Sequence, residues 1–526
     1  MTTHPATTAL PRRFNMAAYC LQAGACAHGS KTALIVVADG RISEPAETWT
    51  YAGLEDAVLR TSAALMATGL HRGDRVLIRL ENTSAYAILF FACLAAGLVA
   101  VPASSQLTDG ETRFLIDDSG ASAIAVSGSL SLANLPPEFQ VFRESKITEM
   151  GRHTTRADYA VTSTEDPAYL IYTSGTTARP KGVLHAHRVA LGRTPTYQGW
   201  YAITPHDRML HAGAFNWTYT LGTGLIDPWA NGATSIVYTG EKHPEVWPDL
   251  IKTTGATLFA AVPGLFRQIL KYAAPGHLDV GRLRHGLIAG ETPPPHLFAD
   301  WKSRTGTDLY EALGMSEIST FISTSPDVPR KSGTTGKPQP GRRVVILPIE
   351  GGTAPLGDNS PGLLAVHRSD PGLMLGYWNR PEEEAQVLRG EWFIGGDLAS
   401  MDLDGYVTHL GRANDLLNAM GYRVSPLEVE AVLAEHPSVA EVACAEVRLR
   451  DDLTVIGAFI VLRGQTEYLP DPDAIIAFAR TRLAAYKCPR EVCFVASLPR
   501  TANGKVQRAA LRILAISESA PSSRSG

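Results

Sequence analysis

The chain has 526 residues and a formal net charge of −4, so more than one domain is expected, and the charge gives no general attraction to nucleic acid or to an anionic membrane. Hydrophobic residues make up 45% of the chain and charged residues 19%, which is an ordinary globular balance. Six scattered cysteines without a C-x-x-C pair predict neither a disulfide framework nor a zinc site, and they favour a reducing, cytoplasmic compartment.

One uncharged run, residues 85–103, is long enough to cross a bilayer on length alone. Gly97 within it predicts the end of a helix, and the LVAVP that follows predicts a short buried strand. A helix and a strand inside an α/β core explain the run without lipid. The first fourteen residues contain two arginines but no apolar run behind them, so we do not expect a secretion signal there.

The first part of the chain, to about residue 400, alternates helical patterns with short apolar runs. The runs are residues 75–80, 122–126, 168–172, 234–238 and 286–290. This alternation predicts an α/β fold, with layered subdomains and parallel strands. Between residues 330 and 410, glycines, prolines and charged turns dominate, which predicts a β-rich subdomain.

A small, mobile α+β domain is predicted at the C-terminal end. The expected division is an N-terminal domain of residues 1–411, a hinge at 412–415 and a C-terminal domain of residues 416–526. In the last of these, Ser425 and Pro426 predict the start of a capped helix. Two strands, a second helix and a third strand are expected to follow at residues 441–447, 455–462, 473–486 and 491–499.

The stretch YTSGTTARPKG, residues 172–182, offers backbone amides, hydroxyls and one ammonium directly after an apolar run. It does not fit the common nucleotide loop, because Lys181 is followed by Gly182 rather than by Ser or Thr. A buried strand that leads into a Gly-rich turn places N–H groups at the carboxyl edge of a sheet, where α/β folds bind ligands. On these residues alone, a phosphate loop and a plain linker both stay open. The other candidate donors are Thr173, Ser174, Gly175, Thr176 and Thr177.

A second stretch, LYEALGMSE at residues 309–317, suits a nucleotide and its metal ion. Gly314 permits the close approach of a flat base. Ser316 and Glu317 offer a hydroxyl and a carboxylate, which are oxygen ligands of the kind that Mg²⁺ takes. The same residues also fit an ordinary loop with a surface glutamate.

Two further candidate site residues lie in the last third of the chain. Asp397 follows two glycines, so its carboxylate can accept hydrogen bonds from two ribose hydroxyls. Lys505 follows the tight-turn signal Asn-Gly and would project from the tip of that turn. A plain turn aspartate and a solvated surface lysine are the alternative interpretations.

Taken together, these motifs resemble the adenylate-forming superfamily of acyl-CoA synthetases, adenylation domains and luciferases. The order is YTSGTTxxPKG, YEALGMSE, GGD…GRxxD and PRTANGKVQR, and the resemblance runs from about Phe14 to Leu511. The segments FNMAAYCL, PGRRVVIL and AAYKCPREV are most similar to benzoate and aryl-acid CoA ligases. The resemblance implies two steps: a carboxylate attacks the α-phosphate of ATP to give acyl-AMP and pyrophosphate, and then the small domain rotates and a thiol displaces AMP.

The resemblance also implies a role for each residue around the nucleotide. Lys181 and the hydroxyls of residues 173–177 would hold the β- and γ-phosphates. Glu317 would bind Mg²⁺, with Ser316 near the α-phosphate. The adenine pocket would be lined by Gly290, Glu291, Thr292, Ala312 and Leu313.

Further implied roles belong to the later part of the chain. Asp397 would bind the ribose with Arg412 nearby, and Lys505 would contact both the substrate carboxylate and the forming adenylate. A lysine on a mobile domain can serve the first step and then leave. Asn414 would lie at the hinge, and Gly421 would line the thiol tunnel.

The segment HAGAFNWTYTLGTG, residues 211–224, matches the family's substrate segment. Asn216 stands where amino-acid-activating members place Asp, which argues against α-amino acids and suits a bond to a ring hydroxyl or amine. Apolar walls for a flat acid would come from Phe215, Trp217, Tyr219 and Gly314. Each of the three aromatic residues is equally well explained as a core residue.

Some positions depart from the family pattern. Ala178 stands in the phosphate loop where the family usually has Gly, which bears on how the loop closes. Asn414 stands where the hinge usually has Asp or Lys, and Gly396 stands where many members have Thr. His185 and His187 are expected to be structural rather than catalytic.

Three functions stay open from the sequence. The first is a CoA ligase for an aromatic, benzoate-like acid, or for a medium-chain or alicyclic acid. The second is an enzyme that loads an acid onto a carrier protein. The third is a non-catalytic nucleotide-binding relative, which predicts the loss of Lys505, Glu317 or Asp397, and all three are present. The expected partners are a small carboxylic acid, ATP, Mg²⁺ and coenzyme A, with no nucleic acid and no membrane, in a monomer or homodimer.

Overall fold

The computed structural model describes most of the chain, and the chain divides into two compact units. The described residues are 10–39, 44–127, 135, 139–173, 180–274, 276–413, 417–419, 422–450, 453–463, 470–500, 506–508 and 510–511. The larger unit contains Met1–Val344 and Val366–Gly395, and the smaller contains Val345–Ala365 and Gly396–Gly526. The expected domain limits and the hinge between them stay predictions.

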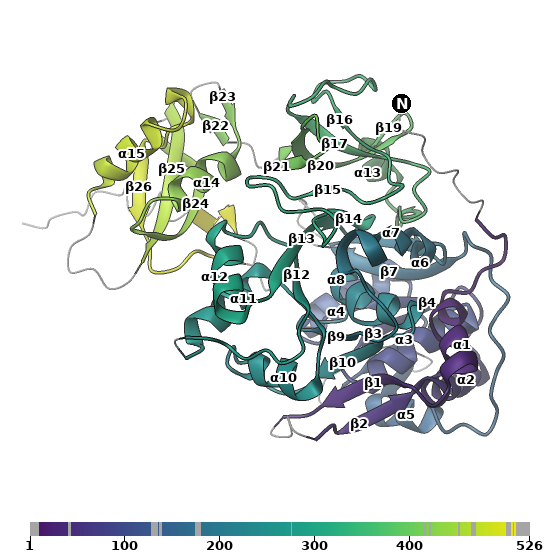
Figure 1. Cartoon of the computed structure of the whole chain (residues 1–526). Helices are drawn as coiled ribbons and strands as arrows, with labels where there is room; N and C mark the ends of the chain where they lie inside the picture. Colours follow the sequence, from purple (N-terminus) through teal and green to yellow (C-terminus); the bar gives the residue numbers. More distant parts are fainter. Residues whose placement is uncertain are drawn as a thin grey trace, which may run out of the picture. The chain divides into compact units, whose positions relative to one another are not determined.

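The first sheet of the larger unit has a parallel centre and antiparallel pairing at one edge. Three of its central strands, β3, β4 and β7, are labelled in Figure 1. The order of the sheet is β18-β8-β7-β4-β3-β5-β6. The strands β3, β4, β5, β6 and β7 run parallel, and β8 pairs antiparallel with both of its neighbours, β7 and β18. The strands are β3 (Arg75–Arg79), β4 (Val99–Pro102), β5 (Ala123–Val126), β6 (Gln140–Arg143), β7 (Pro167–Thr173), β8 (Lys181–Ala186) and β18 (Gly376–Tyr377). The helices in this part of the sequence are α1 (Met16–His28), α2 (Tyr51–Ala67), α3 (Ser84–Ala96), α4 (Asp109–Ser119) and α5 (Glu144–Met150).

The second sheet of the larger unit has nine strands in the order β15-β14-β13-β12-β11-β9-β10-β1-β2. The strands from β13 to β1 in this order run parallel, and β14, β15 and β2 run antiparallel at the two edges. The strands are β1 (Thr32–Val37), β2 (Glu47–Thr50), β9 (Arg208–His211), β10 (Thr234–Tyr238), β11 (Leu258–Ala261), β12 (His285–Ala289), β13 (Asp308–Met315), β14 (Ser319–Ser323) and β15 (Lys337–Pro338).

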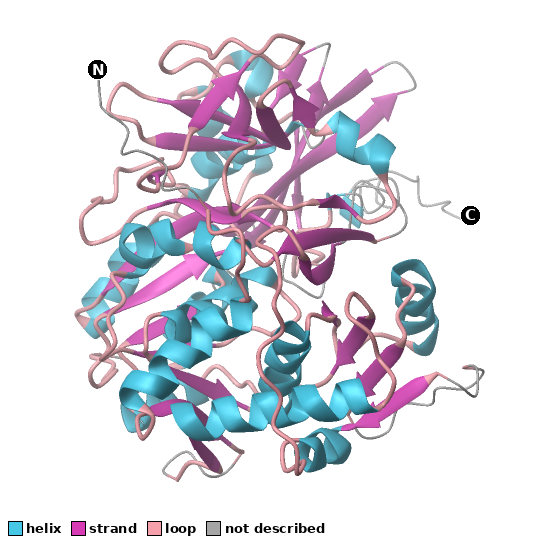
Figure 2. Cartoon of the chain, turned by 90° about the vertical axis from the view of Figure 1, so that its right-hand side faces the viewer, coloured by secondary structure: helices cyan, strands magenta, loops and turns pink. Residues whose placement is uncertain are grey.

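Helices lie against the strands of this unit (Figure 2), which gives the layered arrangement predicted from the alternating pattern. They are α6 (Val189–Gly192), α7 (Thr194–Thr196), α8 (Thr218–Leu221), α9 (Asp227–Ala230), α10 (Val246–Thr254), α11 (Pro263–Tyr272), α12 (His296–Thr305) and α13 (Pro381–Gln386), with π-helical turns η1 (Tyr197–Tyr201) and η2 (Gly222–Ile226). The apolar runs named from the sequence all coincide with strands, namely β3, β5, β7, β10 and β12.

The uncharged run of residues 85–103 is a buried helix and a buried strand, as predicted. Every residue of α3 is buried, and so is every residue of β4. Gly97 ends the helix with φ at 75°, a left-handed conformation that glycine adopts without a Cβ penalty. Among the described residues, no helix combines the length and the apolar character needed to cross a membrane.

The β-rich segment follows the prediction, and the last part of the chain has the predicted order of elements, but its second helix ends at Arg480 and its third strand at Phe494, earlier than predicted. A five-stranded sheet has the order β16-β17-β20-β19, with β21 beside β20. Its strands are β16 (Val344–Leu347), β17 (Gly362–His367), β19 (Leu388–Arg389), β20 (Trp392–Met401) and β21 (Val407–Arg412). The later elements are β22 (Leu417–Ala419), β23 (Tyr422–Val424), α14 (Pro426–Ala434), β24 (Val439–Arg450), β25 (Leu453–Leu462), α15 (Pro472–Arg480), η4 (Ala485–Lys487) and β26 (Glu491–Phe494). Ser425 caps α14, since its Oγ accepts a hydrogen bond from the backbone N–H of Glu428 at 3.4 Å.

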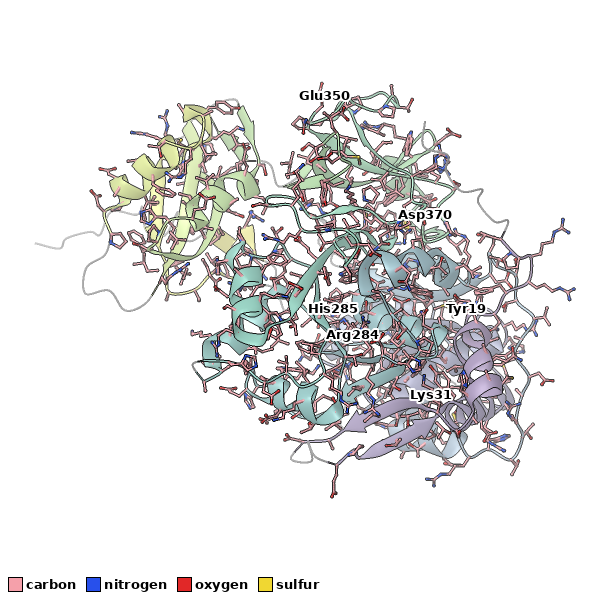
Figure 3. All side chains as sticks on the ribbon, viewed as in Figure 1. Tyr19, Lys31, Arg284, His285, Glu350 and Asp370 are labelled. Atoms are coloured by element: carbon pink, nitrogen blue, oxygen red, sulfur yellow. The ribbon has the colours of Figure 1, made fainter. Side chains whose placement is uncertain are left out.

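A polar cluster joins the amino ends of three parallel strands in the second sheet. Asp207 precedes β9, and its Oδ2 lies 2.9 Å from Nη2 of Arg284. Arg284, labelled in Figure 3, precedes β12. Thr257 precedes β11 and donates from Oγ1 to Asp207 Oδ1 at 2.6 Å. These contacts fix the strands at one end of the sheet, and the loops at the opposite, carboxyl end carry many of the candidate site residues.

A buried ion pair joins two helical segments of the larger unit. Arg193 Nε lies 2.7 Å from Asp227 Oδ1, and Nη2 lies 2.5 Å from Oδ2. The two side chains are 3% and 0% exposed. Tyr201 donates to Asp227 Oδ2 at 2.8 Å. Burial alone would lower the pKa of the Arg193 guanidinium, but the charge of Asp227 holds that pKa above its ordinary value.

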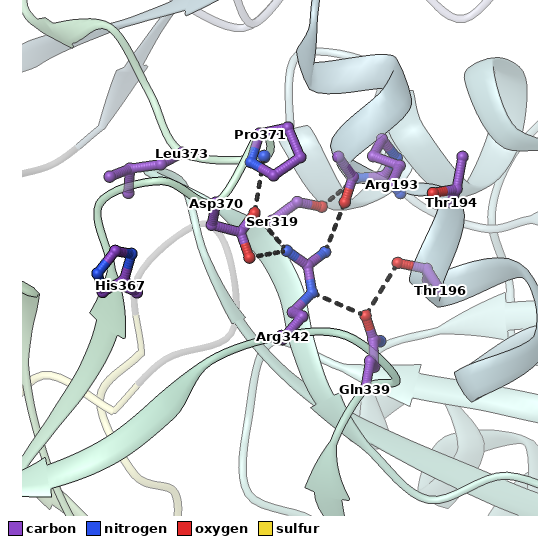
Figure 4. A network of polar contacts seen from close by, with 12 residues as sticks. Arg193, Thr194, Thr196, Ser319, Gln339, Arg342, His367, Asp370, Pro371 and Leu373 are labelled. Atoms are coloured by element: carbon purple, nitrogen blue, oxygen red, sulfur yellow. Dashed lines mark hydrogen bonds and ion pairs between the residues drawn. The ribbon is translucent and has the colours of Figure 1, made fainter. Parts of the chain in front are cut away.

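A second buried pair lies beside the first (Figure 4), and both arginines hold the start of β14. Arg342 Nη1 lies 2.8 Å from both carboxylate oxygens of Asp370. Arg342 Nη2 donates to the carbonyl of Thr320 at 3.2 Å, and Arg193 Nη1 donates to Ser319 Oγ. The two guanidinium groups therefore fix neighbouring residues of one strand.

Replacing Asp227 by Asn should destabilise the protein strongly, because Arg193 would keep a buried charge with no counter-ion. We expect a loss of about 3–5 kcal/mol in the free energy of unfolding, measured in urea. The matched control is Asp117→Asn, which removes an exposed Arg113–Asp117 pair of 2.9 Å and should cost less than about 1 kcal/mol. The double variant Arg193→Met/Asp227→Leu should recover most of the loss. Equal effects of the two single substitutions would contradict this account.

Candidate functional site

Parallel strands bring several of the candidate residues to one edge of the second sheet. Strands β9, β11, β12 and β13 are neighbours and run parallel, so their carboxyl ends meet at the same edge. The acid segment follows β9, residues 290–292 follow β12, and Ser316 and Glu317 follow β13. This edge is where open α/β sheets bind their ligands. The predicted acid segment after β9 and the predicted adenine residues after β12, far apart in sequence, are thus separated at this edge by one strand, β11.

The backbone around Glu317 is held at successive residues. His185 Nε2 donates to the carbonyl of Ser316 at 2.8 Å, and the N–H of Met374 donates to the carbonyl of Glu317 at 2.7 Å. The two buried arginines hold the residues that follow. His185 is buried, and burial lowers its pKa to about 3, so it is a neutral donor in this frame. It thereby acts structurally, in line with the expectation for His185.

Lys181, Tyr377 and Glu317 form a continuous arrangement. The Lys181 ammonium lies 3.8 Å from the centroid of the Tyr377 ring. The Tyr377 hydroxyl donates to Glu317 Oε1 at 2.6 Å. Lys181 Nζ also lies 3.8 Å from Glu383 Oε2 on α13. The sequence analysis did not find Tyr377, because a Tyr in a Gly-Tyr-Trp run carries no spacing signal of its own.

The predicted phosphate loop is described only at its two ends. Thr173 is the last residue of β7 and pairs across the antiparallel ladder with Lys181, the first residue of β8. The loop therefore begins after Thr173 and ends before Lys181, and these two residues lie opposite each other in the ladder. The intervening candidates Ser174, Gly175, Thr176 and Thr177 lie outside the described residues, as does Ala178.

The adenine segment combines an exposed glycine with a buried acid. A Cβ at Gly314 would lie 2.5 Å from the carbonyl oxygen of Ser319, so no side chain fits there. Ala312 is buried and Leu313 is partly exposed on the same strand. Glu311, which the sequence analysis did not single out, is buried, and burial raises its pKa to about 8. Strongly perturbed acids gather at functional sites, which makes Glu311 a further candidate.

Residues 290–292, the other part of the predicted adenine pocket, leave β12 through a left-handed turn. Gly290 has φ at 94°, and a Cβ there would strain the backbone. Glu291 is partly exposed and Thr292 is exposed.

In the acid segment, the two outer aromatic residues belong largely to the core. Phe215 is 2% exposed and packs on Tyr86, with ring centroids 5.2 Å apart. The Tyr219 hydroxyl lies 3.2 Å from the carbonyl of Leu287 and 3.3 Å from that of Ala261. Asn216 and Trp217 are partly exposed. Their roles toward an acid stay predictions.

Three polar residues outside the predicted set support this segment. Asn82 donates to the carbonyl of Gly213 at 2.7 Å and accepts from the N–H of Phe215 at 3.0 Å, so one amide fixes the turn. His211 Nδ1 accepts from the N–H of Gly213 at 2.9 Å, and burial lowers the pKa of His211 to about 3. Lys242 donates to the carbonyl of Ala212 at 3.2 Å. None of these contacts is visible in sequence spacing, because each joins distant segments or depends on backbone conformation.

In the smaller unit, Asp397 is paired with two basic side chains. Its Oδ1 lies 3.2 Å from Nε of Arg412 and 3.1 Å from Nε2 of His409, and the Asp397 side chain is 6% exposed. Arg412 is thus near Asp397, and His409 is an addition to the predicted set. Gly396 has φ at 84°, which explains why glycine rather than threonine suits this position. Asn414, Gly421 and Lys505 lie outside the described residues.

The chemistry of Glu317 fits a magnesium ion held chiefly by a nucleotide. No group of three or more His, Cys, Asp or Glu side chains suited to a metal ion occurs among the described residues. Mg²⁺ beside a nucleotide needs only one or two carboxylates, since phosphates and water supply its other ligands. Within the part of the chain that the structure describes, the Tyr377 hydroxyl bonds Oε1 of Glu317, which leaves Oε2 for a cation.

Comparison with known sequences gives two family matches and close relatives. Residues 21–378 match the AMP-binding enzyme family, and residues 428–505 match the AMP-binding enzyme C-terminal domain. A 3-hydroxybenzoate–CoA ligase of Aromatoleum sp. (strain CIB) is 32% identical over 507 residues, which cover 91% of this chain and 95% of the ligase. A mitochondrial acyl-coenzyme A synthetase of Homo sapiens is 32% identical over 473 residues, which cover 85% of this chain and 80% of the synthetase.

Comparison with solved structures supports the same assignment. An anthranilate CoA ligase in complex with anthranoyl-AMP matches with a TM-score of 0.86 and 29% identity, covering 96% of this chain and 98% of that one. The match confirms the predicted fold class, in which layered α/β subdomains are combined with a smaller C-terminal domain.

Replacing Gly314 by Ala should disturb β13 and β14, the two strands joined by the turn that carries Glu317. The added Cβ would lie within 2.8 Å of three backbone atoms of Ser319 and Thr320, so the backbone must shift. We expect a loss of about 1–3 kcal/mol in the free energy of unfolding, together with weaker ATP binding. The control is Gly110→Ala on α4, where no atom lies within 4 Å of the new Cβ and a gain of up to about 1 kcal/mol is expected. Urea unfolding and calorimetry measure both, and an unchanged Gly314→Ala variant would contradict the crowding argument.

Proposed function

The chain belongs to the AMP-binding enzyme family, and from this premise we propose that it is an ATP-dependent carboxylic acid–CoA ligase acting on an aromatic, benzoate-like acid. The observation that carries the proposal is the Lys181–Tyr377–Glu317 arrangement, which offers a cation and a carboxylate that are not paired with each other. A triphosphate with its metal ion needs both. The relatives named above support the ligase class, since they are CoA ligases and an acyl-coenzyme A synthetase.

In the proposed first step, a carboxylate oxygen of the acid attacks the α-phosphorus of ATP. The bond between the α-phosphorus and the bridging oxygen breaks, and pyrophosphate leaves with acyl-AMP as the product. Such a reaction depends on positioning and charge neutralisation more than on covalent catalysis. Lys181 and Thr173 would bind the leaving phosphates, and Lys505 would contact the attacking carboxylate. Glu317 would hold Mg²⁺, which neutralises phosphate charge when bound.

In the proposed second step, the thiol of coenzyme A attacks the carbonyl carbon of acyl-AMP. The thiol proton passes to solvent, the acyl–phosphate bond breaks, and AMP leaves. We propose that residues 412–415 act as the hinge for the change between the steps, with Asn414 at its centre and Gly421 lining the thiol tunnel. Asp397, with Arg412 beside it, would bind the ribose.

The substrate proposal rests on the acid segment and on the relatives. Asn216 is an uncharged amide, which does not suit the ammonium of an α-amino acid and can bond a ring hydroxyl or amine. The relative from Aromatoleum, whose match covers 91% of this chain, is named as a ligase of 3-hydroxybenzoate. A medium-chain or alicyclic acid is the second candidate, because a mitochondrial acyl-coenzyme A synthetase, whose name specifies no aromatic acid, is equally identical to this chain.

Pyrophosphate exchange over a panel of acids tests the proposal. We expect exchange with benzoate or one of its hydroxy or amino derivatives, weaker exchange with octanoate, and none with phenylalanine. AMP release that requires coenzyme A would then identify the thiol acceptor. No exchange with any acid would refute the ligase proposal, and exchange without CoA-dependent AMP release would favour a carrier protein.

Replacing Lys505 by Ala should separate the two steps. Adenylation, measured by pyrophosphate exchange, should fall about 100-fold or more because the charge that contacts the forming adenylate is removed. Thioester formation from synthetic acyl-AMP should change little, since Lys505 has no role after the adenylate has formed. The control is Lys302→Ala, which removes a lysine that is 51% exposed and paired with Asp308. Equal loss in both half-reactions would argue against the assigned role.

A further inference from the structure

The segment that carries Tyr377 is hydrogen-bonded to the two segments that carry Lys181 and Glu317. Tyr377 pairs with Val183 in the antiparallel ladder between β18 and β8, and β8 begins at Lys181. On the other side, the N–H of Met374 donates to the carbonyl of Glu317. Tyr377 is 6% exposed, so its ring has little freedom. Its position is therefore fixed relative to the backbone of both charged residues.

The two functional groups of the Tyr377 side chain act on different charges. The face of the ring lies 3.8 Å from the Lys181 ammonium, a distance at which a cation is attracted to the ring electrons. The hydroxyl lies 2.6 Å from Glu317 Oε1 and donates to it. A charge-assisted hydrogen bond to one carboxylate oxygen restrains that oxygen and leaves the other oxygen free of the donor.

The ring also separates charges that would otherwise attract each other. No ion pair joins Lys181 and Glu317 in the described structure, although both contact the same side chain. A direct pair would use the ammonium and the carboxylate to neutralise each other, and a nucleotide would have to break it before binding. The phenol keeps these two charges out of such a pair, and the partner of Lys181 is instead Glu383, at 3.8 Å.

We propose that Tyr377 is a positioning residue that keeps Lys181 and Glu317 apart and oriented for a nucleoside triphosphate and its divalent cation. The inference rests on the proposed function, because it concerns the same ATP site. Tyr377 contacts neither the nucleotide nor the metal ion in this proposal. Its hydroxyl acts through Glu317, and its ring acts through Lys181.

The test measures ATP binding by calorimetry on the full chain without an acid, once with excess Mg²⁺ and once with EDTA. Tyr377→Phe keeps the ring and removes the hydroxyl. It should reduce the Mg²⁺-dependent gain in ATP affinity about tenfold, as expected for a lost hydrogen bond to a charged group, while affinity in EDTA stays within about twofold. Tyr377→Leu removes the ring as well and should also weaken binding in EDTA.

Two controls separate positioning from a general loss of structure. Tyr159→Phe removes a hydrogen bond of 2.9 Å from a tyrosine to Glu55, the same chemical change at another place, and should leave both affinities unchanged. In a Glu317→Gln background, Tyr377→Phe should have no further effect on the Mg²⁺-dependent gain, because the hydroxyl acts through that carboxylate.

The outcomes distinguish this inference from the function on which it rests. A wild-type chain that does not bind ATP would refute the proposed function. A wild-type chain that binds ATP with a Mg²⁺-dependent gain, together with a Tyr377→Phe variant that keeps this gain, would refute only the role of Tyr377. An equal loss with Mg²⁺ and with EDTA, or a full effect of Tyr377→Phe in the Glu317→Gln background, would also overturn it.

Discussion

The buried pair of Arg193 and Asp227 is the interaction on which the candidate site depends most. A guanidinium and a carboxylate this deeply buried are stable only when each satisfies the other and the remaining donors find acceptors. One of those acceptors is Ser319, and the parallel pair of Arg342 and Asp370 supplies a second anchor at the next residue. The loop that carries Glu317 is thereby held from its carboxyl side by two charges that cannot move without large cost.

The site itself follows from a separation of charge. Lys181 lies at the start of one strand of the first sheet and Glu317 follows a strand of the second, and Tyr377 stands between them as a neutral aromatic group. A cation and a carboxylate that are held close together but not paired with each other suit a polyphosphate with its metal ion. The same logic applies at the acid segment, where Asn82 fixes the turn without adding charge.

The sequence predicted the architecture well because its signals are local. Alternating apolar and amphipathic runs predict α/β layers, and a glycine within the uncharged run predicts where α3 ends and β4 begins. Ser425 before Pro426 predicts the cap of α14. The order of four short motifs was enough to identify the family, since each motif uses residue types that are read directly from the chain. Lys505, Asn414 and Gly421, which the same motifs single out, stay predictions outside the described residues.

The sequence by itself determined the fold class, the family and the residues expected to meet the nucleotide. Only the tertiary structure decided which of them are held in place and by what. Tyr377 meets Glu317 across 60 positions of sequence, and Arg193 meets Ser319 across 126. The left-handed backbone conformation of Gly396 is likewise seen only in the folded chain. Such contacts leave no periodic or spacing signal, because they arise when strands from distant segments pair and bring otherwise ordinary residues within hydrogen-bonding distance.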